Sequence, residues 1–199
     1  VILCDKDRRK AEGAAKKFKL KKVYTDPIEM IEEERPDVID NCTPVQLHTP
    51  LSIEAMRRGC HVIVEKPMAL TREDANKMIE VARKNHVKLF PIHNSLFNPV
   101  FIKARQIIRH GDIGKVVGME VIYLKRRDDP WVINPDHWSH RLPGGIFGEI
   151  LAHPIYLLLS IIGYPVKVVC VFTKKFLSYP WLKADELIAC LLYTSDAAD

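Results

Sequence analysis

The sequence lacks the features that define several protein classes. Its five cysteines are widely spaced and form no Cys-x-x-Cys pair, which argues against a disulfide framework or a zinc site and favours free thiols in a reducing, cytoplasmic compartment. We see no internal repeat or low-complexity tract. The longest apolar run, residues 146–162, contains Glu149, His153 and Pro154, so it is too short and too polar to span a membrane.

Excess positive charge is confined to one end of the chain. The formal net charge is +5, but nine Lys/Arg and only three Asp/Glu fall within residues 1–22, which leaves a net charge of −1 for the rest. No aromatic residues interleave with this segment apart from Phe18 and the nearby Tyr24. Such a segment is typical of a solvated helix surface, so we expect no nucleic-acid partner.

Strand-type and helix-type segments alternate in the first half of the chain. Apolar, β-branched runs predict strands at 1–5, 38–41, 62–64 and 87–92, with helices such as 26–34 and 47–58 between them. The alternation predicts an α/β fold with a Rossmann-type, doubly wound parallel sheet. Because residues 62–64 are a continuous apolar run, we expect that strand to be covered on both faces.

The pattern changes after Asn94. A helix is predicted at 99–109, a strand at 116–124, a loop at 125–143, an apolar helix from Gly144 to Gly163 that is interrupted at Pro154, and a strand at 166–173. We therefore predict two domains, a dinucleotide-binding domain at 1–94 and the start of an α+β, open-sheet domain at 95–189. Residues 190–199 lose the pattern and resemble translated sequencing-adapter sequence, so we expect a non-native tail.

The first predicted strand ends in Asp5. In a dinucleotide-binding fold, a carboxylate at the end of the second strand binds the ribose hydroxyls and favours NAD over NADP. The alternative is that Asp5 caps the next helix, and Arg8 and Arg9 keep NADP possible. The glycine-rich phosphate loop, expected about 20 residues earlier, is absent, so we expect the chain as given to bind cofactor weakly and to be inactive.

Polar residues also follow the next two predicted strands. Thr43 and His48 follow residues 38–41, and Glu65 and Lys66 follow residues 62–64. Parallel strands present their carboxyl ends at one edge of the sheet, where α/β proteins bind ligands. A Glu-Lys pair is usually just solvated, but polar groups at three successive strand ends favour a site. Pro67 would present Lys66 from a stiff turn.

Glu149 and His153 lie four residues apart, so both project from one face of the predicted apolar helix. The pair is either a satisfied structural contact or a base with its orienting partner in a dry pocket. His137, His140 and His153 could be taken for a metal cluster, but they offer no Cys and no clear third ligand in register, so we expect no metal site.

These motifs resemble the glucose-fructose oxidoreductase and inositol dehydrogenase family over about residues 1–189. The resemblance is carried by residues 1–5, Asn41-Cys42-Thr43-Pro44 with His48, Glu65-Lys66-Pro67, and Gly144-Gly145 followed by Glu149 and His153. It implies a Rossmann domain that binds NAD(P), and a second domain that shapes the substrate site and a homo-oligomer interface. The implied reaction is hydride transfer from a secondary alcohol of a sugar, cyclitol or related polyol.

The resemblance also implies roles for single residues. Lys66 would bind the substrate hydroxyl and assist proton transfer, Glu65 would orient Lys66, and His153 would be the catalytic acid or base. Glu149 would be a third catalytic residue beside Lys66 and His153. These three residues and Trp138 would contact the substrate. Together with Lys66, the residues predicted to bind the cofactor are Asp5, Cys42, Thr43, Pro44, His48, Glu65 and Asn94.

The chain departs from the family pattern at three positions. Glu149 stands where the family usually has Asp, Leu96 where it has Arg, and Tyr156 where it often has an acid. Glu149 and Leu96 keep one alternative open, a non-catalytic NAD(P)-binding sensor on the same fold.

Overall fold

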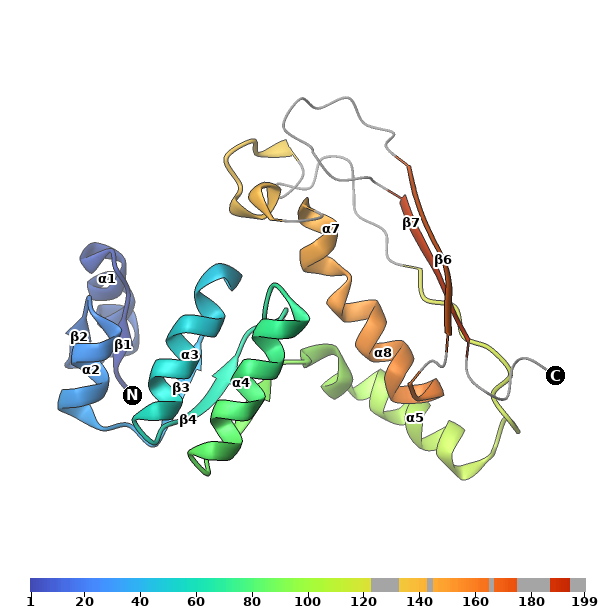
Figure 1. The fold of residues 1–199 in the computed structure, drawn as a ribbon, viewed down its shortest axis with the longest axis horizontal. Coiled ribbons are helices and arrows are strands. Elements are labelled where there is room, and N and C mark those ends of the chain that lie inside the picture. The colour runs from blue at the N-terminus through green and yellow to red at the C-terminus, as the bar shows by residue number, and fades with distance from the viewer. Residues whose placement is uncertain (123–132, 143–144, 165–166, 175–186, 194–199) are drawn as a thin grey trace. The chain divides into compact units, whose positions relative to one another are not determined.

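The computed structural model describes residues 1–122, 133–142, 145–164, 167–174 and 187–193. It divides into two compact units, Val1–Ile92 and His93–Asp199, and each is described by itself (Figure 1).

The first unit alternates parallel strands with helices. In chain order it contains β1 (Leu3–Cys4), α1 (Arg8–Phe18), β2 (Val23–Tyr24), α2 (Pro27–Glu34), β3 (Val38–Asn41), α3 (His48–Arg57), β4 (His61–Val64), α4 (Arg72–Lys84) and β5 (Leu89–Pro91). The strands form two parallel ladders, β1–β2 and β3–β4–β5. The prediction of a parallel α/β fold is confirmed, although β2 was not predicted because two residues carry no periodic signal.

Helix starts follow the capping residues that the sequence offers. The Asp26 carboxylate accepts hydrogen bonds from the backbone N–H groups of Ile28 and Glu29, and Pro27 occupies the first turn of α2. The Thr71 hydroxyl likewise accepts from the N–H of Asp74 at the start of α4. At the other end of α3, Gly59 has a φ of 85°, the left-handed conformation that glycine adopts without steric cost.

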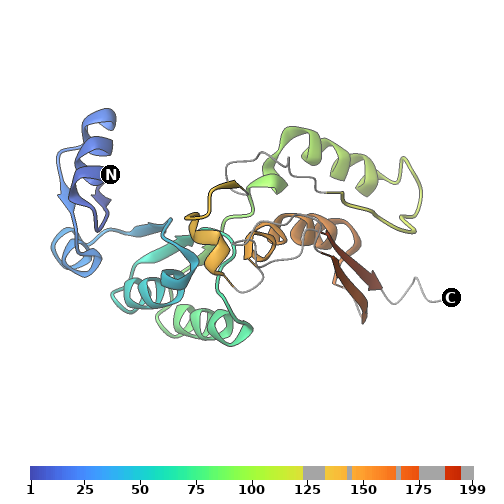
Figure 2. The same cartoon turned by 90° about the horizontal axis from the view of Figure 1, so that it is seen from above.

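The core of the first unit lies between the β3–β4–β5 ladder and one layer of helices. α3 and α4 pack side by side on the same face of these strands (Figures 1 and 2). Met56, Val64 and Met78 are fully buried there. On the other face Ile63 is only half-buried and Phe90 is 50% exposed, so the prediction that β4 is covered on both faces is wrong for the described residues. Both helices lie on one side.

The second unit begins with a 3-10 turn, η2 (Asn94–Phe97), and α5 (Pro99–His110), which Asn98 caps. It continues with η3 (Trp138–Arg141), α7 (Gly145–Ile150), α8 (Ala152–Ile162), β6 (Lys167–Lys174) and β7 (Leu187–Tyr193). The predicted interruption of the apolar helix is present, since α7 and α8 are separate at Leu151. Pro154 explains it, because proline has no N–H to donate to the carbonyl of Ile150.

One expectation for the second unit needs correction. Residues 116–122 form no strand, so the strand predicted at 116–124 is absent over its described part. Residues 190–193, at the start of the predicted tail, belong to β7, which pairs antiparallel with β6. Residues 123–124 and, of the predicted loop, residues 125–132 and 143 lie outside the described residues. Among the helices that the structure describes, none is long and apolar enough to cross a membrane.

Candidate functional site

The carboxyl ends of β3 and β4 form one continuous rim of polar groups. The two strands pair in parallel with Asn41 opposite Val64, and the backbone N–H of Glu65 donates to the carbonyl of Asn41 at 3.1 Å. The loops that follow the two strands therefore start side by side. The first carries Cys42, Thr43 and Pro44, and the second carries Lys66 and Pro67, so the structure brings these predicted residues to one edge of the sheet.

The Asn41 side chain holds the first loop through hydrogen bonds. It is buried, and its amide nitrogen donates to the backbone carbonyl of His48 at 3.3 Å and to the Ser52 hydroxyl at 3.1 Å. Its amide oxygen accepts from the N–H of Thr43 at 3.3 Å and from the Thr43 hydroxyl at 2.7 Å. Every hydrogen-bonding group of this side chain is thus used to fix the loop, as a buried amide requires. The sequence analysis gave no role to Asn41 or Ser52.

His48 connects the two loops. Its side chain is 1% exposed, with Nε2 lying 2.7 Å from the carbonyl oxygen of Thr43 and Nδ1 lying 2.9 Å from that of Pro67. A neutral imidazole donates to one of these carbonyls and an imidazolium donates to both. Because both ring nitrogens already contact the backbone, His48 would act on a nucleotide through the loops that it holds. We call Thr43, His48 and Pro67 the loop clamp.

Glu65 and Lys66 are both partly buried at the end of β4. The backbone N–H of Lys66 donates to Oε2 of Glu65 at 3.1 Å, and the Lys66–Pro67 peptide bond is cis. The Glu65 carboxylate thus bonds the main chain of the residue that it was predicted to orient. Such a contact holds the backbone from which the lysine side chain projects.

Asp5 lies just beyond the end of β1 and is exposed. Its Oδ1 accepts a hydrogen bond from the N–H of Asp7 at 2.8 Å, whereas the residue that caps α1 is Asp7 itself. The alternative that Asp5 caps this helix is therefore wrong, because Asp7 is the cap. An exposed carboxylate at the carboxyl end of a parallel strand is suited to accept hydrogen bonds from ribose hydroxyls.

Cys42 is a protonated thiol at neutral pH. Partial burial of the sulphur, with the hydrogen bond that it donates to Asp40 at 3.4 Å, raises the pKa of the Cys42 thiol to about 11. Since the thiolate is the nucleophilic form of cysteine, Cys42 is unsuited to covalent catalysis. It remains a predicted cofactor contact.

The second unit contains a separate polar cluster, which we call the His153 cluster: His93, Asn94, Ser95, His153 and Tyr156. Tyr156 is buried, and its hydroxyl oxygen lies 2.6 Å from Nδ1 of His153. The same hydroxyl donates to the amide oxygen of Asn94 at 3.1 Å and accepts from the N–H of Ser95 at 3.2 Å. Of these residues, Asn94 and His153 were predicted for the site. Tyr156 was noted only as a departure, and Ser95 was missed.

Trp138 and Glu149 lie on neighbouring elements of the second unit, because η3 contacts α7. Glu149 is 3% exposed, whereas Trp138 is half-buried and its ring lies against that of His137, with 5.6 Å between centroids. His140 is buried on η3, and within the described residues its ring nitrogens have no hydrogen-bond partner. Among those residues, no group of three His, Cys, Asp or Glu side chains is arranged to hold a metal ion.

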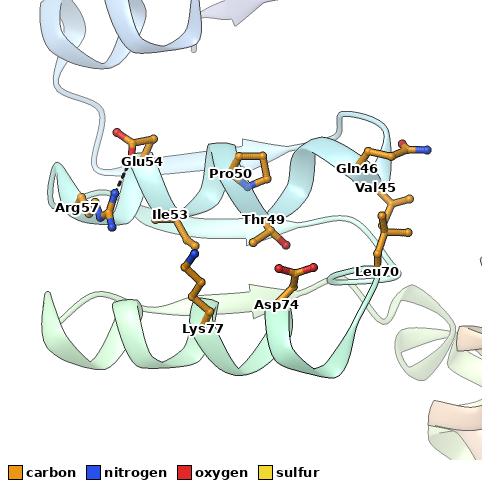
Figure 3. A pocket seen from close by; sticks show the side chains of 10 residues that line it. All are labelled: Val45, Gln46, Thr49, Pro50, Ile53, Glu54, Arg57, Leu70, Asp74 and Lys77. Atoms are coloured by element: carbon orange, nitrogen blue, oxygen red, sulfur yellow. Dashed lines mark hydrogen bonds and ion pairs between the residues drawn. The ribbon is translucent and has the colours of Figure 1, made fainter.

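The first unit also has a surface groove of about 350 Å³ between α3 and α4 (Figure 3). Thr49 of α3 and Asp74 of α4 face each other across it, and Arg57 pairs with Glu54 at 2.9 Å along one side (Figure 3). Its lining includes two acidic and two basic side chains, and none of the predicted site residues. The groove is therefore separate from the strand-end rim.

Two family models together match nearly the whole chain. Residues 1–93 match an oxidoreductase family with an NAD-binding Rossmann fold, GFO_IDH_MocA, and residues 101–198 match the GFO/IDH/MocA C-terminal domain.

Similar proteins agree with this match. Myo-inositol 2-dehydrogenase of Thermotoga maritima is 32% identical over 151 residues, which are 76% of this chain and 43% of the relative. D-glucoside 3-dehydrogenase of Escherichia coli K12 is 29% identical over 167 residues, 83% of this chain and 47% of the relative. The crystal structure of myo-inositol 2-dehydrogenase from Lactobacillus plantarum has the same fold, with a TM-score of 0.82, 24% identity, and coverage of 99% of this chain and 59% of that one. The chain spans about half the length of the curated relatives it matches.

Proposed function

The chain belongs to the GFO/IDH/MocA oxidoreductase family, and on that premise we propose that the whole protein transfers hydride between NAD(P) and a secondary alcohol of a sugar, cyclitol or related polyol. The observation that carries the proposal is the match of both domains of this family to one chain whose curated relatives include an inositol and a glucoside dehydrogenase. The substrates named for these relatives are small, polyhydroxylated rings. We therefore propose a small-molecule substrate of that class.

The carboxyl ends of β1, β3 and β4 support the cofactor part of the proposal. Asp5 offers an exposed carboxylate, and Thr43 and Pro44 lie on a loop that the loop clamp holds in place. These residues fit the ribose and nucleotide portions of a dinucleotide, and the acid at position 5 favours NAD over NADP. When bound, the nicotinamide supplies the hydride chemistry. Cys42, His48, Glu65, Lys66 and Asn94 complete the proposed cofactor-binding set.

We assign the proton chemistry to the side chains of the chain itself. His153 takes the proton of the substrate hydroxyl, Lys66 polarises the oxygen, and Glu149 balances the local charge. His153 suits the role because imidazole titrates near neutral pH and because the His153 cluster orients it from Nδ1. The buried Glu149 and the half-buried Trp138 are proposed substrate contacts.

The family resemblance supports a homo-oligomer for the full-length protein. The thiols of Cys4, Cys42 and Cys60 are free, which supports the proposed reducing, cytoplasmic compartment.

The proposal is tested with the full-length protein by following NADH formation across a panel of sugars and cyclitols. We expect turnover of at least one, and a loss of about 100-fold or more in Lys66→Met and in His153→Asn, the usual contribution of a positioned acid or base. Lys103→Met and His110→Asn are matched controls, because both residues are exposed on α5. NADH binding without turnover of any polyol would favour the sensor instead.

A further inference from the structure

The Tyr156 hydroxyl links three members of the His153 cluster. One hydroxyl oxygen lies within hydrogen-bonding distance of three groups: Nδ1 of His153 at 2.6 Å, the amide oxygen of Asn94 at 3.1 Å and the N–H of Ser95 at 3.2 Å. A hydroxyl has one proton to donate and two lone pairs to accept with. Three partners therefore use its full capacity, and the direction of each bond can be derived.

The backbone settles the first direction. The N–H of Ser95 is always a donor, so it occupies one lone pair of the Tyr156 hydroxyl. The amide oxygen of Asn94 is always an acceptor, so it takes the single hydroxyl proton. Only a lone pair remains for Nδ1 of His153, and that nitrogen must then carry a proton to donate. A second contact of Nδ1, 3.5 Å to the Ser95 hydroxyl, is too long to reverse this order.

Packing holds the phenol ring in the required orientation. The imidazole of His93 stacks on it, with centroids 4.4 Å apart and an interplanar angle of 21°. Burial lowers the pKa of His93, so this ring is neutral at neutral pH. Tyr156 itself is 6% exposed, which limits the access of water to its ring and hydroxyl. α8, which carries Tyr156 and His153, also contacts η2, which carries Asn94 and Ser95.

We propose that Tyr156 is a positioning residue that holds neutral His153 in the tautomer protonated at Nδ1, so that Nε2 is the basic nitrogen. The catalytic role of this tautomer rests on the proposed function, in which His153 takes the proton of the substrate hydroxyl. The assignment of the tautomer does not depend on that function. Each proton of the cluster then has one acceptor: Nδ1–H donates to the phenol oxygen, and the phenol O–H donates to the Asn94 oxygen. Tyrosine thus does with a neutral hydroxyl what a carboxylate does beside a catalytic histidine.

The direct test is the tautomer of His153 in the full-length protein. Long-range proton–nitrogen correlation spectra of protein labelled with nitrogen-15 at histidine distinguish a protonated ring nitrogen from one with a lone pair. We expect the proton on Nδ1 at a pH above the titration of the ring, with the signal assigned by its absence in His153→Asn. A proton on Nε2 in the unsubstituted protein would overturn the proposal without any further variant.

Substitutions sharpen the test. Tyr156→Phe should shift His153 toward the Nε2-protonated tautomer, whereas Tyr164→Phe should leave it unchanged, since Tyr164 is 87% exposed. Asn94→Asp keeps an oxygen that accepts the hydrogen bond from the Tyr156 hydroxyl, so it should preserve the Nδ1–H tautomer. Loss of that tautomer in Asn94→Asp, or its persistence in Tyr156→Phe, would contradict the proposed bond directions.

Kinetics separate this inference from the proposed function. If His153 is the base, Tyr156→Phe should lower kcat about tenfold, because fewer molecules carry a basic Nε2, and should leave KM for the alcohol unchanged. Full turnover in His153→Asn would remove the proposed base but leave the tautomer result standing. A protonated Nε2 in an active enzyme would remove the inference but leave the proposed reaction standing.

Discussion

The loop clamp in the first unit and the His153 cluster in the second are built differently. The clamp joins a buried imidazole to two backbone carbonyls, on loops that already start at adjacent strands. The cluster joins side chains of α8 to η2, about 60 residues earlier in the chain, mainly through one phenol hydroxyl. The clamp therefore depends on the strand order, whereas the cluster depends on the identity of single side chains.

This difference explains which parts of the site the sequence predicts. Parallel strands put Thr43 and Lys66 on one rim whatever surrounds them, so local patterns suffice. No local pattern brings Tyr156 to Asn94, because their contact depends on how a helix packs against a distant turn. The position of the rim therefore follows from strand order, whereas the side-chain network on the helix follows from tertiary packing.

The largest change in stability is expected from His48→Ala, which tests the loop clamp. It removes at least one hydrogen bond, which contributes about 1 kcal/mol, and leaves a cavity in a fully buried position. We expect the first unit to lose about 3 kcal/mol of unfolding free energy, measured by urea denaturation, since cavities add to the lost bonds.

His110→Ala is the control for this experiment, because His110 is exposed and should cost little. Equal stability of His48→Ala and His110→Ala would show that the clamp does not hold the loops. It would also remove the contrast between the two regions.

A smaller effect should sharpen the account of the His153 cluster. Burial lowers the pKa of His93 in the folded protein below its ordinary value of 6.5, so the folded state resists protonation of this ring. A histidine with a lowered folded-state pKa contributes stability above the unfolded pKa, and that contribution is lost as pH falls below it. The second unit should therefore lose stability on acidification through about pH 6.5.

His93→Phe isolates this contribution, because it keeps an aromatic ring to stack on Tyr156 and cannot titrate. Subtracting its urea midpoints from those of the unsubstituted protein, on both sides of the titration, removes the contribution of His153 and the other histidines. An identical pH dependence in the two proteins would contradict the partly buried, neutral state of His93.

Much of the fold could be predicted because its signals are short-range. Asp26 followed by Pro27 marks the start of α2, and Pro154 accounts for the break between α7 and α8. The failures have physical causes as well. Phe18 is spaced to share an apolar face of α1 with Ala11 and Ala15, yet it is 64% exposed beneath the Lys17 ammonium, whereas the two alanines are buried. Burial of β4 on one face depended on which side α3 and α4 pack, and no residue within the strand encodes that.

The central claim is that hydride passes from a substrate carbon to nicotinamide, and isotope transfer tests it most directly. The polyol found in the panel, deuterated at the carbon to be oxidised, is incubated with NAD and the full-length protein, and the nicotinamide product is analysed by mass spectrometry. We predict that the reduced nicotinamide carries the deuterium, and that His153→Asn abolishes the transfer. Oxidised product with the deuterium released to water, or no transfer from any polyol while NAD is bound, would contradict the account.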